Sequence, residues 1–174
     1  VEQSQKMRLT YAGIFYENIT PEYFLKAFKQ LSIERPDIAA NIELEFIGHL
    51  RKENNKLISE LGINEFVRDH GYLDHNETVK RLKASDVLWM MIGNIQNADT
   101  ISTSKLYEYI GTGKPILGSV VEGTAKSALQ EYGASFITKP DDIQEIKNTI
   151  ILIHSLYIKK NLPTPNRDFI QKHD

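Results

Sequence analysis

The stretch from Ile101 to Ser119, ISTSKLYEYIGTGKPILGS, decides how the rest of this chain is interpreted. It predicts a helix that begins at Thr103 or Ser104, because a hydroxyl side chain can accept a hydrogen bond from the free amides of a first helical turn. Three apolar side chains then recur at the spacing of one helix face, namely Leu106, Tyr109 and Ile110. Glycine and proline end the helix at Gly111, Gly113 and Pro115, and a buried strand follows directly.

The opposite face of this helix carries one cation and one carboxylate, Lys105 and Glu108. Both lie near the positive end of the helix dipole. Free amides and Lys105 can hold phosphate oxygens, and Glu108 can accept hydrogen bonds from ribose hydroxyls, so this pattern suits a nucleoside diphosphate. A simpler interpretation stays open, in which Glu108 only matches the helix dipole and pairs with Lys105 at i,i+3.

The composition is that of an ordinary globular domain. Of 174 residues, 41% are hydrophobic and 25% are charged, which suffices for one core. The net charge of −2 and the pI near 6.2 give no basic field, so we expect no nucleic-acid partner. The absence of cysteine excludes disulfides and thiolate zinc sites and fits a reducing compartment. The sequence has no long apolar run that would predict a membrane span or signal peptide. We expect a cytoplasmic protein, of which this chain is a processed or excised piece.

Strand and helix patterns alternate about six times along the chain. Strands are predicted at residues 7–13, 42–48, 67–73, 87–92, 115–120 and 134–137, and helices at 21–33, 52–61, 77–84, 103–110, 124–133 and 143–160. The expected caps are Thr20, Asp74 or Asn76, and Asp141. The run VLWMMI at 87–92 is typical of a central strand that is covered on both faces. Residues 1–6 are assigned to a linker and residues 161–174 to a tail, which is a further linker or a docked end.

This alternation predicts a single α/β domain at residues 7–160, a Rossmann-like three-layer sandwich with an open, mostly parallel sheet of about six strands. Ligands of such sheets bind beyond the carboxyl ends of the strands, where the strand order reverses. The turns after the first four strands therefore border the expected site, at residues 13–18, 48–51, 72–75 and 93–105.

Several familiar motifs fail on spacing. The segment Gly111 to Lys114 lacks the first glycine of a phosphate-binding loop and runs into a strand rather than a helix. The turn after the first strand lacks the second and third glycines of a dinucleotide site, which argues against NAD. The five histidines show no zinc-ligand spacing, so we expect no metal. A G-x-S-x-G nucleophile elbow is also absent.

Four segments taken together resemble a known family: ASDVLW at 84–89, TSKLYEYIGTGKPIL at 103–117, EG at 122–123 and YGASFI at 132–137. They look like the C-terminal half of a two-domain GT-B glycosyltransferase of the retaining family-4 type. The resemblance extends over most of the chain, and its most specific part is K-L-Y-E-Y-I-G-T-G-K-P. In that family this half binds the nucleotide-sugar donor, and the N-terminal half binds the acceptor.

The resemblance implies a role for individual residues. Glu108 would grip the ribose, the amides around Ser104 and Lys105 would hold the diphosphate, the turn at Gly13 would approach the phosphates, and residues 72–75 would flank the base. The chain departs from the family at two positions: Thr100 stands where an acid contacts the donor sugar, and Asn18 stands where a basic residue is usual. Lys105 and Arg51 remain as candidates for phosphate charge. The candidate donor-binding residues are Gly13, Asn18, Tyr72, His75, Thr100, Thr103, Ser104, Lys105 and Glu108.

The function implied is transfer of a sugar from a nucleoside-diphosphate sugar, without metal or cofactor, in bacterial surface polysaccharide or glycoconjugate synthesis. A glycan or lipid-linked acceptor would bind through the absent N-terminal half, so this fragment alone would be inactive, and the full enzyme could associate peripherally with a membrane. Two alternatives stay open. One is a sugar-nucleotide 2-epimerase of the same two-domain build, and the other is a non-catalytic nucleotide-binding or scaffold domain.

Overall fold

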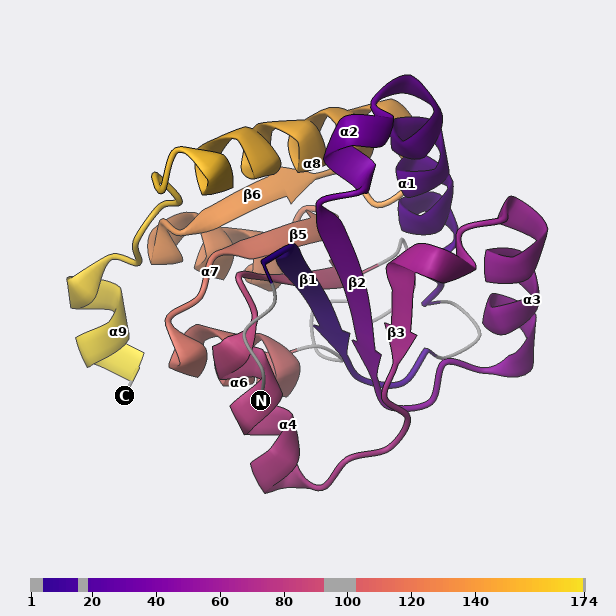
Figure 1. Cartoon of the computed structure of the whole chain (residues 1–174). Coiled ribbons are helices and arrows are strands. Elements are labelled where there is room, and N and C mark those ends of the chain that lie inside the picture. Colours follow the sequence, from indigo (N-terminus) through magenta and orange to yellow (C-terminus); the bar gives the residue numbers. More distant parts are fainter. Residues whose placement is uncertain (1–4, 16–18, 93–102, 174) are drawn as a thin grey trace.

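The computed structural model describes residues 5–15, 19–92 and 103–173 as one α/β domain built on a six-stranded sheet (Figure 1). The strands are β1 (Met7–Ala12), β2 (Ile42–Ile47), β3 (Val67–Asp69), β4 (Val87–Ile92), β5 (Ile116–Val120) and β6 (Ser135–Thr138). The helices are α1 (Glu22–Glu34), α2 (Pro36–Ala39), α3 (Lys52–Leu61), α4 (His75–Ala84), α6 (Thr103–Thr112), α7 (Thr124–Tyr132), α8 (Ile143–Ile158) and α9 (Arg167–His173), with a short 3-10 helix, η1 (Asn64–Phe66).

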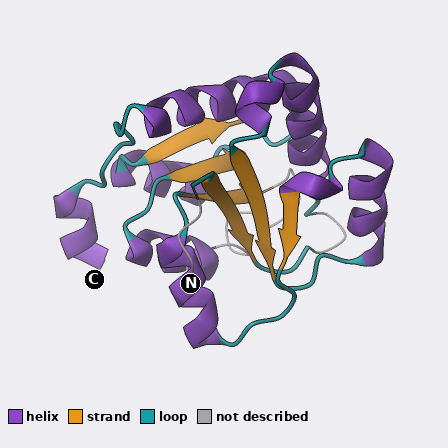
Figure 2. Cartoon of the chain, viewed as in Figure 1, coloured by secondary structure: helices purple, strands orange, loops and turns teal. Residues whose placement is uncertain are grey.

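All neighbouring strands are parallel, in the order β3-β2-β1-β4-β5-β6. The predicted Rossmann-like sandwich is therefore confirmed. The order reverses between β1 and β4, which pair only at Leu9 with Val87 and Thr10 with Leu88. Figure 2 shows the arrowheads of β1, β2 and β3 at the same end of the sheet. That end, next to the reversal, is where a ligand site is expected.

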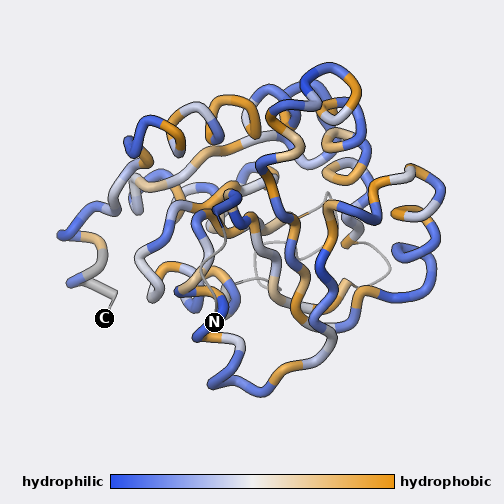
Figure 3. The backbone as a smooth tube through the Cα atoms, viewed as in Figure 1, coloured by the Kyte–Doolittle hydropathy of each residue, from blue (hydrophilic) through white to orange (hydrophobic). Residues whose placement is uncertain are grey.

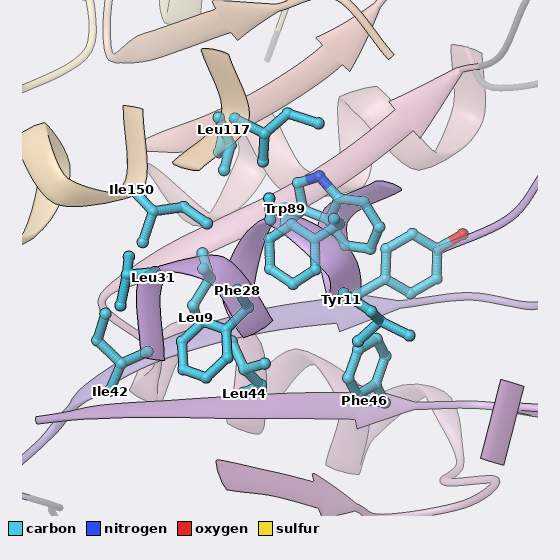
Figure 4. Packing of buried hydrophobic residues seen from close by; sticks show 14 of the residues in the cluster. Leu9, Tyr11, Phe28, Leu31, Ile42, Leu44, Phe46, Trp89, Leu117 and Ile150 are labelled. Carbon is cyan, nitrogen blue, oxygen red and sulfur yellow. The ribbon is translucent and has the colours of Figure 1, made fainter. Parts of the chain in front are cut away.

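Helices cover both faces of the sheet, and each face has its own apolar cluster. The first cluster joins α1, α3 and α8 to the sheet, and the second joins α4, α6, α7 and α9. Strand β4 shows why VLWMMI is apolar throughout, because Trp89 packs in the first cluster, Met90 packs in the second, and all six residues are buried. Figure 3 shows hydrophobic colour along the strands, and Figure 4 shows Trp89 with Phe28 and Tyr11 in the first cluster.

Several local predictions are confirmed. Helix α3 occupies the predicted residues and ends at Gly62, whose φ of 69° is left-handed. Asp74 caps α4, since its Oδ1 accepts a hydrogen bond from the Glu77 amide at 2.8 Å. The tail is a docked end, because α9 places Phe169 against Tyr132 with 6.3 Å between the ring centroids.

Other local predictions are wrong. The third strand ends at Asp69 rather than at 73, because Gly71 adopts a φ of 64° and turns the chain away from the sheet. Asp142, not Asp141, caps α8 by accepting from the Glu145 amide at 3.0 Å. Pro21 precedes the first residue of α1, and Thr20 accepts from the Glu22 amide instead of from deeper in the turn. The short helices α2 and η1 were not predicted, since neither is long enough to give a periodic pattern.

Candidate functional site

A pocket of about 290 Å³ lies at the carboxyl ends of β1 and β2, beside the reversal of strand order. Its described lining comes from β1 and its turn, β2 and its turn, the segment that joins β3 to α4, and helices α4 and α6. The lining residues are Ala12, Gly13, Ile14, Ile47, Gly48, Tyr72, Leu73, His75, Thr78, Lys105 and Glu108. The pocket therefore contains residues of all four turns that the topology argument singled out, with Lys105 as the described residue of the last one.

Two glycines form a wall of bare backbone in this pocket. Gly48 has a φ of 114°, and a Cβ added there would lie 2.4 Å from the Gly13 carbonyl oxygen. Gly13 has a φ of 148°, and its added Cβ would lie 3.2 Å from the Lys105 ammonium nitrogen. A side chain at either position would occupy the space between the two turns and the lysine, so only glycine leaves this part of the pocket open.

Lys105 projects from α6 into the pocket beside Gly13. Its ammonium lies over the Tyr109 ring, 6.0 Å from the ring centroid. Burial lowers the pKa of the Lys105 ammonium, and the nearby Glu108 carboxylate opposes that shift. An ammonium group in such a dehydrated position is strongly favoured by an anionic partner, because the anion compensates the lost hydration.

Glu108 lies one turn further along α6, on the pocket side. Its side chain is 29% exposed, and its Oε1 lies 4.0 Å from Nδ1 of His75, the first residue of α4. The carboxylate therefore remains available to a hydroxyl donor from a ligand. Tyr72, 86% exposed, stands at the rim and offers an uncovered aromatic ring.

A buried tyrosine hydroxyl holds α6 against the sheet at the reversal of strand order. The Ala12 amide donates to the Tyr109 hydroxyl at 2.9 Å, and that hydroxyl donates to the Trp89 carbonyl at 2.8 Å. Burial raises the pKa of Tyr109 well above its ordinary value, so the hydroxyl remains a donor. Both backbone groups are thereby satisfied where β1 and β4 no longer pair with each other.

Five predicted site residues meet in this pocket: Gly13, Tyr72, His75, Lys105 and Glu108. Asn18 and Thr100 lie outside the described residues, and for Thr103 and Ser104 only the helical backbone is described. Six further lining residues were not among the candidates. Ile14, Gly48 and Leu73 lie in the predicted turns, whereas Ala12, Ile47 and Thr78 were missed. These last three carry no motif, and only their position near the predicted turns could have indicated them.

Arg51, the other candidate for phosphate charge, points elsewhere. Its Nε lies 2.9 Å from Glu53, and its guanidinium donates to the Phe15 carbonyl at 3.2 Å. Lys105 is therefore the only lysine or arginine among the described residues that line the pocket. Within the described part of the chain, no three histidine, aspartate or glutamate side chains gather as they would around a metal ion.

The sequence of residues 2–165 matches the family model described as "Glycosyl transferases group 1". The chain belongs to this family. A comparison with curated protein sequences gives no match. Among the residues that the structure describes, none of the helices has the length and apolar character needed to cross a bilayer.

The fold resembles several solved structures. Anabaena HepE, solved with UDP and glucose, has a TM-score of 0.69 and 17% identity, with 91% of this chain and 41% of that chain covered. WaaG, a glycosyltransferase involved in lipopolysaccharide biosynthesis, has a TM-score of 0.71 and 17% identity, with 97% and 42% covered. A putative UDP-N-acetylglucosamine 2-epimerase from Listeria monocytogenes has a TM-score of 0.60 and 16% identity, with 98% and 40% covered. This chain thus spans about two fifths of these proteins, and at such identities the likeness concerns the fold alone.

Proposed function

We propose that this chain is the nucleotide-sugar donor-binding half of a two-domain GT-B glycosyltransferase, the C-terminal half of a retaining, family-4-type enzyme. The full enzyme would move a sugar from a nucleoside-diphosphate donor to a glycan or lipid-linked acceptor. The family membership supports glycosyl transfer, and the structure of HepE with UDP and glucose supports this class of donor. The involvement of WaaG in lipopolysaccharide biosynthesis supports a surface-polysaccharide context.

One observation carries the proposal: Lys105 and Glu108 share a pocket with the bare backbone of Gly13 and Gly48 at the reversal of strand order. A nucleoside diphosphate needs a cation and close backbone for its phosphates and a hydrogen-bond acceptor for its ribose. In the proposed complex Lys105 and the first amides of α6 hold the diphosphate, Glu108 accepts from the ribose, and Tyr72 and His75 border the base.

The proposed chemistry needs little from this half beyond binding and charge stabilisation. When the bond between sugar and diphosphate breaks, negative charge grows on the leaving phosphate. The Lys105 ammonium and the helix amides would stabilise that charge, an effect on the order of 3 kcal/mol for each well-placed donor. Contacts to the acceptor would come from the other half of the enzyme, which is why we expect this fragment alone to be inactive.

Titration of this chain with UDP, GDP and ADP, followed by NMR, tests the proposal. At least one of them should bind, and even a millimolar dissociation constant, about 4 kcal/mol, would count because half of the cleft is absent. Glu108→Ala should weaken binding at least about tenfold, because the ribose loses a charged acceptor. Glu60→Ala is the matched control, since Glu60 is exposed on α3, pairs with Lys56 at 3.8 Å and does not line the pocket.

Binding of none of the three nucleotides would favour a scaffold domain instead. The fold is also shared by a putative 2-epimerase, so the second test uses the full-length protein. A transferase releases nucleoside diphosphate only when an acceptor is present, whereas a 2-epimerase converts the nucleotide sugar to its 2-epimer without one. Acceptor-dependent release of nucleoside diphosphate would therefore support transfer.

A further inference from the structure

Tyr109 connects the two strands between which the order of the sheet reverses. Its side chain is fully buried, and its hydroxyl bridges the Ala12 amide of β1 and the Trp89 carbonyl of β4. Burying a hydroxyl is unfavourable unless its partners are in place, and here both the donor and the acceptor capacity are used. The bridge therefore fixes where α6 stands relative to the ends of β1 and β4.

The same bridge reaches the pocket from two sides. Ala12 and its neighbour Gly13 line the pocket from β1. Lys105, one turn before Tyr109 on α6, and Glu108, immediately before Tyr109, line it from the helix. The tyrosine ring also lies beneath the Lys105 ammonium. One side chain thus sets the separation between the glycine turn and the cation that faces it.

The Gly13 turn and the Lys105 side chain lie close together, with little free space between them. A Cβ at Gly13 would lie 3.2 Å from the Lys105 ammonium and 3.3 Å from its Cε, so the lysine already packs closely against the turn. A displacement of about 1 Å between a binding group and its ligand is enough to lower function strongly. Any shift of α6 would therefore be felt first by a phosphate held between Lys105 and Gly13.

A second buried tyrosine offers a comparison within the same apolar cluster. The Tyr132 hydroxyl donates to the Lys114 carbonyl at 2.8 Å, and burial raises the pKa of Tyr132. Tyr132 therefore resembles Tyr109 in burial and in bonding to backbone. It differs in that neither Tyr132 nor Lys114 lines the pocket.

We propose that Tyr109 is a positioning residue for the diphosphate, whose hydroxyl holds Lys105 at the correct distance from the Gly13 turn. This inference rests on the proposed donor-binding function. It assigns Tyr109 no contact with the ligand. The hydroxyl acts through α6, which carries Lys105 and Glu108, and through β1, which leads into Gly13.

Tyr109→Phe tests this, because it keeps the ring beneath Lys105 and removes only the bridge. Wild type is first titrated separately with UDP, GDP and ADP. The nucleoside diphosphate that binds most tightly, and the nucleoside that corresponds to it, are then titrated against each variant. Tyr109→Phe should weaken the diphosphate about tenfold, as expected for one lost buried hydrogen bond, and should change the nucleoside by less than about twofold. Tyr132→Phe should lower the melting temperature but leave both affinities unchanged. Equal diphosphate affinity in Tyr109→Phe and wild type, or equal losses in the two variants, would overturn the inference.

A double-mutant cycle separates positioning from general loosening of the fold. If Tyr109 acts through Lys105, then Tyr109→Phe should weaken diphosphate binding much less in a Lys105→Ala background, whereas independent effects would add and contradict the proposal. If Tyr109→Phe does not fold, hydrogen exchange of the wild type decides: diphosphate should slow exchange of the Ala12 amide, and unchanged exchange would overturn the proposed coupling between the Tyr109 bridge and the diphosphate. If wild type binds no nucleotide, both the donor-site proposal and this inference fail. If wild type binds and Tyr109→Phe binds equally well, only this inference fails.

Discussion

Strand β2 presents opposite chemistry to the two faces of the sheet. Toward α1 it contributes Ile42, Leu44 and Phe46, all within the first apolar cluster. Toward the other face it contributes Glu43 and Glu45 before Ile47, and both acids form ion pairs with Arg8 of β1. Arg8 lies 3.7 Å from Glu43 and 3.4 Å from Glu45, and His70 lies 2.6 Å from Glu45.

The difference separates stability from function. Not one described lining residue of the pocket belongs to the first cluster, whereas Ala12 and Ile47 belong to the second. The α1 and α8 face is packed with aromatic and aliphatic side chains and has no part in the pocket. The α4 and α6 face carries the pocket, the lysine and the glutamate. Substitutions on the two faces should therefore change different measurements.

The largest expected effect is a loss of stability from a substitution on the face of the sheet that α1 and α8 cover, here called the first face. Phe28 is fully buried in α1, with its ring 5.1 Å from that of Phe66. Phe28→Ala should reduce the free energy of unfolding by about 3–5 kcal/mol, through lost apolar burial and the cavity that remains. Urea denaturation measures this. Nucleotide affinity, measured where the variant is still folded, should stay that of wild type, and a parallel loss of affinity would show that the two faces are not independent.

The next largest effect is the reverse, a loss of nucleotide affinity with little change in stability. It comes from the face that carries α4 and α6, here called the second face. Lys105→Ala should weaken diphosphate binding by about 1.5–3 kcal/mol, the contribution typical of a hydrogen bond to a charged group. Stability should change little, because burial lowers the pKa of Lys105 and the folded chain gains little from its charge. Calorimetric titrations with UDP and uridine measure the difference. Lys26→Ala is the control, since Lys26 pairs with Glu22 on α1, at 2.9 Å, away from the pocket. Equal losses for UDP and uridine would contradict the phosphate role.

Gly48→Ala should lower both stability and affinity, which makes it the intermediate case. A Cβ there meets the Gly13 carbonyl oxygen at 2.4 Å, and a φ of 114° is strained for any L side chain. We expect a loss of about 1–3 kcal/mol in unfolding free energy, together with weaker diphosphate binding because the Gly13 turn must move. Gly62→Ala, at a φ of 69° with only Lys29 near its Cβ, should cost about 1 kcal/mol and leave binding intact. Unchanged binding in Gly48→Ala would mean that the turn is not part of the site.

The sequence revealed much of the second face for a physical reason. The helix pattern of residues 103–110 and the glycines after strands one and two report local backbone requirements, and the parallel topology then brings Lys105, Glu108 and Gly13 to one edge. Non-local relations were not predictable in this way. That the Tyr109 hydroxyl would bridge two strands depends on where α6 lies, and the apolar spacing of Tyr109 reports only that its ring is buried.

The C-terminal tail is a second case in which a non-local contact could not be predicted from local sequence patterns. Its prolines suggested a linker as readily as a docked end, and the interaction that decides between them joins Phe169 to Tyr132, 37 positions earlier in the chain. The pairing of Glu45 with Arg8 and His70 is likewise invisible to periodicity. Alternation predicts which side of a strand a residue occupies, but not whether charges on that side will find partners on neighbouring strands.

The smallest expected effect is a pH dependence of stability that belongs to the first face. His154 on α8 is 4% exposed, and its Nε2 lies 2.8 Å from Asn41 Oδ1. Burial lowers the pKa of His154 below its ordinary value, although Asp37 opposes the shift. The unfolded chain, with a histidine pKa of about 6.5, therefore takes up this proton at a higher pH than the folded chain does.

The sign follows from that order of proton uptake. The contribution of His154 to stability is fully present above about pH 6.5, declines as the pH falls through that value, and levels off below the folded pKa. Between pH 7.5 and 5.5 the unfolding free energy of wild type should fall more steeply than that of His154→Gln, which keeps an amide donor for Asn41. Other titrating groups are common to both proteins and cancel in the difference. Equal slopes would show that this buried histidine contributes nothing, whereas a pH-dependent difference in nucleotide affinity would show that the first face is coupled to the pocket after all.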